Sequence, residues 1–197
     1  MVELDRRAVA ATLTALERWS PAAAGRPTPC TKWTLQDLLA HMTAQQRGFA
    51  RASAGERTVL ADWAPVVEDD PIGAYAESCE QVLAAFAALT DPDAPVYLPE
   101  ITDAPLPAGM VVGFHLVDNV VHAWDVAATL GERLGLDADV LAAGLAVARA
   151  VPDDEHRDRE GAAFARRLPV DEGADPLAET LRLLGRDPNW AAADPAG

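Results

Sequence analysis

The segment from Pro107 to Gly131 constrains the fold more than any other part of the chain. Proline is favoured in the first turn of a helix and glycine just after its last turn, so both ends of a helix are marked. Between them, large apolar residues recur at alternating spacings of four and three: Met110, Phe114, Val117, Val121 and Trp124. That spacing places them on one face of a helix. We therefore predict a long amphipathic helix here.

Three earlier segments show the same helical periodicity. The first is predicted to end near Trp19, before a proline-rich loop over 20–29. The second begins at Thr34, because Thr34 followed by Asp37 has the pattern of a capping box, with Asp in place of the usual Glu. The third is predicted over 71–89. With the helix that ends at 131, these segments make four antiparallel helices.

The remaining segments are shorter. The proline-rich stretch over 91–107 is predicted to be a long connection with one short β-prone piece at 96–98. A fifth helix is predicted over 137–150, followed by the charged stretch DDEHRDRE over 153–160. A last short helix is expected over 176–184, where an aspartate before it and a glycine after it mark the ends.

These elements predict an all-α protein in two parts. Residues 1–131 are expected to form a four-helix bundle, and residues 132–197 a helical C-terminal extension that packs on it. A chain of 197 residues with 50% hydrophobic content is long enough to bury one sizeable core.

Charge and hydropathy exclude several classes of function. The net charge of -15 argues against nucleic acid and against an anionic membrane surface, because both attract basic proteins. No apolar run approaches the roughly 20 residues that cross a bilayer, and the first residues, MVELDRRAVAATL, do not have the pattern of a secretory signal. We therefore expect a soluble cytoplasmic protein whose two cysteines are reduced thiols.

Three residues on predicted helices form a candidate metal site. Asp118 and His122 are four residues apart, so they lie one above the other on one helix face. His41 belongs to a separate helix, which can supply a third ligand when the helices pack as a bundle. Two imidazoles and one carboxylate form the kind of ligand set that leaves a metal position open for water or substrate. This set therefore indicates a metal site that takes part in a reaction more than one that only stabilises the fold.

Neighbouring residues suggest additions to this site. His115 lies one turn before Asp118 and is interpreted as a further ligand, as a group that orients the carboxylate, or as a residue that simply caps a pocket. Asp125 can bond to His122 from three residues further along the helix, or it can be a solvated or backbone-capping side chain. Cys30 lies in a loop and is not enough to propose a nucleophile, and Cys79 falls on an apolar helix face, as in core packing.

Three blocks of sequence also carry a resemblance. They are, in chain order, PCTKWTLQDLLAHM, HLVDNVVHAWDVAATLG and LLGRDPNW. They resemble the bacterial DinB-like proteins related to the N-terminal domain of mycothiol-dependent maleylpyruvate isomerase. The resemblance implies a bundle of up-down-down-up type that holds a divalent metal, zinc or nickel, through His41, Asp118 and His122. The isomerase-type pattern has glutamate where this chain has Asp118.

The resemblance further implies a function. A low-molecular-weight thiol such as mycothiol would be activated for addition to an electrophilic small molecule, in a thiol-dependent transferase or isomerase. A metal-dependent hydrolase, a non-catalytic metal-binding module and a metal-free helical scaffold remain as alternatives. No residue stands out as a general base. The expected partners are a small-molecule substrate or thiol, and the exposed edges of a small bundle are compatible with a homodimer.

Overall fold

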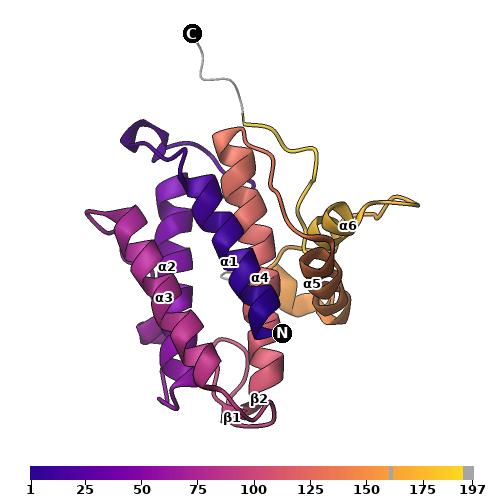
Figure 1. Ribbon diagram of the computed structural model, residues 1–197. Coiled ribbons are helices and arrows are strands. Elements are labelled where there is room, and N and C mark those ends of the chain that lie inside the picture. Colours follow the sequence, from indigo (N-terminus) through magenta and orange to yellow (C-terminus); the bar gives the residue numbers. More distant parts are fainter. Residues whose placement is uncertain (160–161, 193–197) are drawn as a thin grey trace.

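The computed structural model describes residues 1–159 and 162–192 (Figure 1). Residue 160, at the end of the charged stretch, and the last five residues of the expected extension lie outside the described residues. The α-helices are, in chain order, α1 (Val2–Leu16), α2 (Leu35–Ser53), α3 (Pro71–Ala88), α4 (Ala108–Leu130), α5 (Ala138–Ala150) and α6 (Pro176–Leu183). The expected all-α class is confirmed.

The first four long helices form the bundle. α2 packs chiefly against α3, and α1 packs chiefly against α4. The start of α2 agrees with the sequence pattern, because the Thr34 hydroxyl accepts a hydrogen bond from the Asp37 amide and the Asp37 carboxylate accepts one from the Thr34 amide. Gly131 ends α4 with a φ of 76°, a left-handed conformation that favours glycine. Local sequence therefore fixes where the two helices that carry the candidate ligands begin and end.

Two helix boundaries and the short strand differ from expectation. α1 ends at Leu16, one turn before Trp19, and α4 begins at Ala108, with Pro107 as its N-cap. The β-prone piece forms only β1 (Pro95–Val96), which pairs antiparallel with β2 (Leu106–Pro107). This two-residue pairing closes the connection between α3 and α4, and it draws Pro107 into the sheet before the helix starts.

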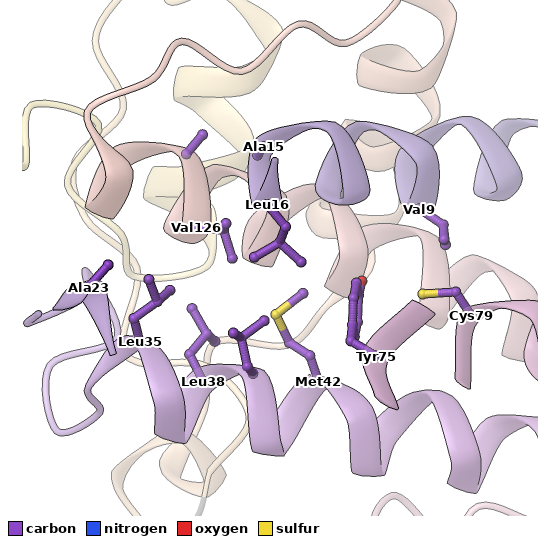
Figure 2. Packing of buried hydrophobic residues seen from close by; sticks show 12 residues of the cluster. Val9, Ala15, Leu16, Ala23, Leu35, Leu38, Met42, Tyr75, Cys79 and Val126 are labelled. Carbon is purple, nitrogen blue, oxygen red and sulfur yellow. The ribbon is translucent and has the colours of Figure 1, made fainter. Parts of the chain in front are cut away.

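The core of the bundle lies between α1, α2, α3 and α4. Figure 2 shows Leu16, Met42 and Tyr75, from three different helices, directed toward a common interior. Val126 adds α4 to the same cluster. Cys79 is 1% exposed in this cluster, so its interpretation as core packing is confirmed. This core fixes the spacing of α2 and α4.

The C-terminal segments pack beside α4. α5 contacts α4, and α6 contacts α5, on the side away from α2 and α3 (Figure 1). A second apolar cluster joins these elements through Trp124 of α4, Leu145 of α5 and Leu181 of α6. Within the described residues, no helix has the length and apolar character required to cross a membrane.

Candidate metal centre

The structure brings the three candidate ligands together. His41 comes from α2, and Asp118 and His122 come from α4. One potential ligand atom of each residue lies within 4.8 Å of those of the other two. Nε2 of His122 is 3.4 Å from Oδ1 of Asp118, and the rings of His41 and His122 meet edge to face with centroids 5.3 Å apart. The spacing of these residues in the sequence thus corresponds to a real cluster in space.

The cluster lies at the edge of the core. The His122 side chain is 3% exposed, whereas the Asp118 side chain retains 21% of its accessible surface. The ring of Trp33, in the loop before α2, lies 4.5 Å from that of His41 between centroids. His122 is therefore the most buried residue of the cluster, whereas His41 and Asp118 are both partly exposed.

A second set of contacts holds His122 through Nδ1, the ring nitrogen that does not face Asp118. Its Nδ1 atom is 2.9 Å from Oδ2 of Asp125, which confirms the expected bond between these two residues. Asp125 is fully buried, and its carboxylate also accepts hydrogen bonds from Arg186, with Nε 3.2 Å from Oδ1. With Nδ1 engaged, Nε2 is the ring nitrogen that remains for the cluster.

Arg186 is a site residue that the sequence analysis missed. Besides Asp125, its Nη2 atom contacts Sγ of Cys30 at 3.3 Å, so it joins the loop before α2 to α4. Burial raises the pKa of the Cys30 thiol to about 11, although the guanidinium of Arg186 opposes this effect. Cys30 is therefore a protonated thiol at neutral pH. The only sequence signal for Arg186 was its position in the block LLGRDPNW.

The charges within the cluster compensate one another. Burial alone would lower the pKa of His122, but the carboxylates of Asp118 and Asp125 together outweigh that effect and the pKa rises to about 9. Burial likewise opposes ionisation of Asp118, yet attraction to His122 holds the pKa of Asp118 at about 2. For His41, burial and repulsion from His122 lower the pKa to about 4. At neutral pH the metal-free cluster therefore contains an imidazolium, a carboxylate and a neutral imidazole.

A further carboxyl group is hydrogen-bonded to the helix that carries His41. Gln45, one helical turn beyond His41, donates from Nε2 to both carboxylate oxygens of Glu100, at 3.2 and 3.0 Å. Glu100 is exposed as a residue, but partial burial of its carboxyl group raises its pKa. The hydrogen bond from Gln45 opposes this rise and repulsion from Asp118 adds to it. Glu100 belongs to the irregular connection before α4, where helical periodicity carries no information.

His115 does not join the cluster. The residue is fully buried, and its Nδ1 atom lies 2.7 Å from Oδ1 of Asp5 on α1, while Nε2 bonds to Oε1 of Gln46 on α2. Both ring nitrogens are thus occupied, and neither contacts Asp118. Its interpretations as a further ligand and as the group that orients Asp118 are therefore wrong. The physical reason is packing across the bundle, because α1 and α2 supply buried partners for both ring nitrogens.

Comparison with known proteins adds a family and a fold. The family model described as "Mycothiol maleylpyruvate isomerase N-terminal domain" matches residues 6–127. Two uncharacterized proteins from two strains of Mycobacterium tuberculosis are each 29% identical over 162 residues, which cover 82% of this chain and 84% of the relative. The family match includes all three residues of the cluster.

Two solved structures have a similar fold. The crystal structure of a histidine-to-alanine mutant of the mycothiol-dependent maleylpyruvate isomerase matches with a TM-score of 0.62 at 15% identity. The structure of the isomerase without that mutation matches with a TM-score of 0.59 at 16% identity. Both comparisons cover 80% of this chain and 70% of the other chain. The expected DinB-like bundle is thereby confirmed.

Proposed function

We propose that this chain, which belongs to the family of the mycothiol maleylpyruvate isomerase N-terminal domain, binds one divalent cation and activates a low-molecular-weight thiol for addition to an electrophilic small molecule. The observation that carries the proposal is the convergence of His41, Asp118 and His122 within 4.8 Å. Mycothiol is the thiol that the family name suggests. A protein with this function would act in the cytoplasm, where thiols are kept reduced.

The donor set fits zinc or nickel. Imidazole nitrogen and carboxylate oxygen are both ligands of these cations, and three protein ligands leave a position open. The bond from His122 to Asp125 directs the other ring nitrogen toward the cluster, as is usual for histidines that bind metals. A divalent cation bound to these residues would lower the pKa of a thiol or water molecule in the open position.

Glu100 supplies the proton acceptor that the sequence did not reveal. In the proposed step, the carboxylate of Glu100 takes the proton of the thiol, and the sulfur of the resulting thiolate forms a bond to the electrophilic carbon. The electron pair displaced from the substrate double bond then takes the proton back from Glu100, so the addition is balanced. Gln45 holds the carboxylate in place through its two hydrogen bonds. A raised pKa, as found for Glu100, suits a group that must both accept and return a proton.

Metal content is the first test of this function. We expect about one zinc or nickel ion per chain in the purified untagged protein, measured by elemental mass spectrometry, and loss of the metal in His41→Ala and His122→Ala. His156→Ala is the matched control, because the His156 side chain is 64% exposed and, among the described residues, forms its side-chain hydrogen bond with Asp154. Absence of metal from the parent after reconstitution with both cations would contradict the proposal and favour a metal-free scaffold.

Turnover separates the remaining alternatives. The metal-loaded protein should consume mycothiol in the presence of an electrophilic probe such as monochlorobimane, and maleylpyruvate tests the isomerase activity directly. Hydrolysis of an activated ester without thiol would instead favour the metal-dependent hydrolase, because an open metal position can equally activate water. Metal binding without either reaction would favour the non-catalytic module. Formation of a homodimer stays a prediction, which light scattering of the same sample would test.

A further inference from the structure

Arg186 reaches the candidate metal centre because of the way α6 ends. Gly185 has a φ of 76°, and the amides of Gly185 and Arg186 donate to the carbonyls of Arg182 and Leu181 at 3.1 and 2.8 Å. These are the two hydrogen bonds of a Schellman motif, which reverses the chain at a helix C-terminus. A Cβ at position 185 would lie 2.7 Å from Cβ of Ala165, so glycine is required here for space as well as for conformation. The turn directs Arg186 toward α4.

The contacts of Arg186 form a continuous chain to the cluster. Its Nε and Nη2 atoms lie 3.2 and 3.3 Å from Oδ1 and Oδ2 of Asp125. Oδ2 of Asp125 is in turn 2.9 Å from Nδ1 of His122. The three residues are 5%, 0% and 3% exposed, respectively, so water competes little for these bonds.

The pairing determines what Asp125 can do to His122. A buried carboxylate without a compensating cation is costly, and it would recover part of that cost by holding a protonated imidazole beside it. Arg186 supplies the compensating charge through a two-pronged contact. Asp125 can then accept a hydrogen bond from the Nδ1 proton of a neutral His122, which leaves Nε2 with a lone pair for a metal.

We propose that Arg186 is a positioning residue of the metal centre, which acts through Asp125 to hold His122 in the orientation and tautomer that bind a cation. This inference rests on the proposed function, because it assumes that the cluster binds metal. It makes the C-terminal extension part of the centre. The family model ends at residue 127, so it includes Asp125 and His122 but not Arg186.

A purely structural role for Arg186 is the competing explanation, and Arg157 provides the control. Arg157 is also a buried arginine of the extension, at 9% exposure. It donates to the carbonyls of Pro152, Ala165 and Leu183 at 2.7 to 2.8 Å and makes no hydrogen bond to Asp125. Replacement of either arginine should destabilise the packing of the extension, whereas only replacement of Arg186 should affect metal affinity.

The test is a zinc titration of the full chain against a chromogenic chelator, for the parent, Arg186→Met, Arg186→Lys and Arg157→Met, with thermal unfolding of each metal-free protein. We expect Arg186→Met to weaken zinc binding about 10- to 100-fold, the range found when groups behind metal-bound histidines are removed. Arg186→Lys should recover part of that loss, because lysine keeps the positive charge but lacks the planar guanidinium that binds a carboxylate through two nitrogens. Arg157→Met should change affinity less than twofold, even where the two methionine variants lose similar stability.

A second readout does not depend on metal. Nitrogen-15 NMR of the His122 ring in the metal-free protein at high pH reports which ring nitrogen carries the proton. The parent should carry it on Nδ1, and Arg186→Met, in which the guanidinium no longer holds the Asp125 carboxylate in place, should show a mixture of the two tautomers. Should Arg186→Met misfold, Asp125→Asn removes the same link and should give a similar loss of affinity.

Two outcomes would overturn different claims. Unchanged zinc affinity in Arg186→Met, or an equal loss in Arg157→Met, would overturn the role of Arg186 and leave the proposed function intact. A parent protein that binds no zinc would overturn the proposed function itself.

Discussion

Nε2 of His122 lies 3.4 Å from Oδ1 of Asp118, so an imidazolium and a carboxylate face each other where a cation would bind. The pKa of about 9 for His122 means that the metal-free protein carries one proton there at neutral pH. Asp118 and His41, with pKa values of about 2 and 4, have no proton to lose. Because a metal requires deprotonated ligands, binding must displace the proton of His122.

Zinc binding near pH 6 should therefore release about one proton from the protein's ligands. Calorimetric titration in buffers of different ionisation enthalpy measures this number. The measurement is made below the pH at which zinc-bound water ionises, with a glutamine in place of Glu100 as a check on protons from that group. Release of no proton would contradict the charge state assigned to His122.

The stability of the metal-free protein should be greatest near pH 6.5. The pKa of His41 is lowered from 6.5 to about 4 by folding, so stability is lost as the pH falls from about 6.5 to 4. The pKa of His122 is raised from 6.5 to about 9, so its contribution is complete below about 6.5 and is lost as the pH rises through 9. Urea unfolding across this range measures both limbs. His41→Ala should flatten the acid limb and His122→Ala the alkaline limb, and a variant with the opposite effect would refute the assignment.

Replacement of Glu100 should affect turnover and not metal content. In Glu100→Gln the amide cannot take the thiol proton, and we expect about a 100-fold lower rate, within the usual range for loss of a general base. The fall in rate at low pH that is caused by protonation of Glu100 should disappear from the pH profile. The zinc content should stay at the parent value. Glu77→Gln, which alters an exposed glutamate on α3, is the control. A rate within threefold of the parent would remove Glu100 from the mechanism.

His115 should be required for the stability of the fold and not for metal binding. His115→Ala leaves the buried Asp5 carboxyl group without its ring partner, and a buried polar group that loses its hydrogen-bond partner costs about 1 to 3 kcal/mol. Chemical denaturation measures the loss, and elemental analysis should find the metal content unchanged. In the double variant with Asp5→Ala, the total loss should be smaller than the sum of the two single losses. Loss of metal in a folded His115→Ala protein would contradict the position assigned to this residue.

Gly48 should not tolerate alanine, although it lies inside a helix. Alanine normally stabilises a helix interior by about 1 kcal/mol relative to glycine. At Gly48, however, the added Cβ would overlap the ring of Trp63, with only 2.7 Å to Cε2. Trp63 follows α2 in the short helix η2 (Leu60–Trp63). Overpacking costs about 1 to 3 kcal/mol, so we expect a net loss of stability by thermal unfolding. Gly25→Ala, where no atom lies within 4 Å of the new Cβ, should be close to neutral.

The parts of the fold that follow from local chemistry could be predicted from the sequence. The capping residues Thr34 and Gly131 mark helix ends because their side chain or conformation completes backbone hydrogen bonds within a few residues. The pairing of Asp118 with His122 follows from the pitch of one helix. The addition of His41 depended on the expectation that its helix packs in the same bundle as α4, and the resemblance to a known family implied the same three ligands. The division of the chain at residue 131 stays a prediction.

Contacts between distant segments could not be predicted in this way. Asp125 and Arg186 are 61 residues apart, and Gln45 and Glu100 are 55 apart. Neither pair has a repeating pattern that would connect them. His115 shows the opposite error, because its place one turn before Asp118 does not reveal that the partners of its ring lie on other helices.

The distance between Asp125 and Arg186 along the chain has a consequence for synthesis. A chain that emerges from the ribosome presents His41, Asp118 and His122 before the arginine that neutralises Asp125 has been made. If Arg186 acts as proposed, cations that meet the growing chain encounter a weaker binding site than the one in the finished protein. Because of this order of residues, the metal is captured most tightly after the C-terminal segment has docked.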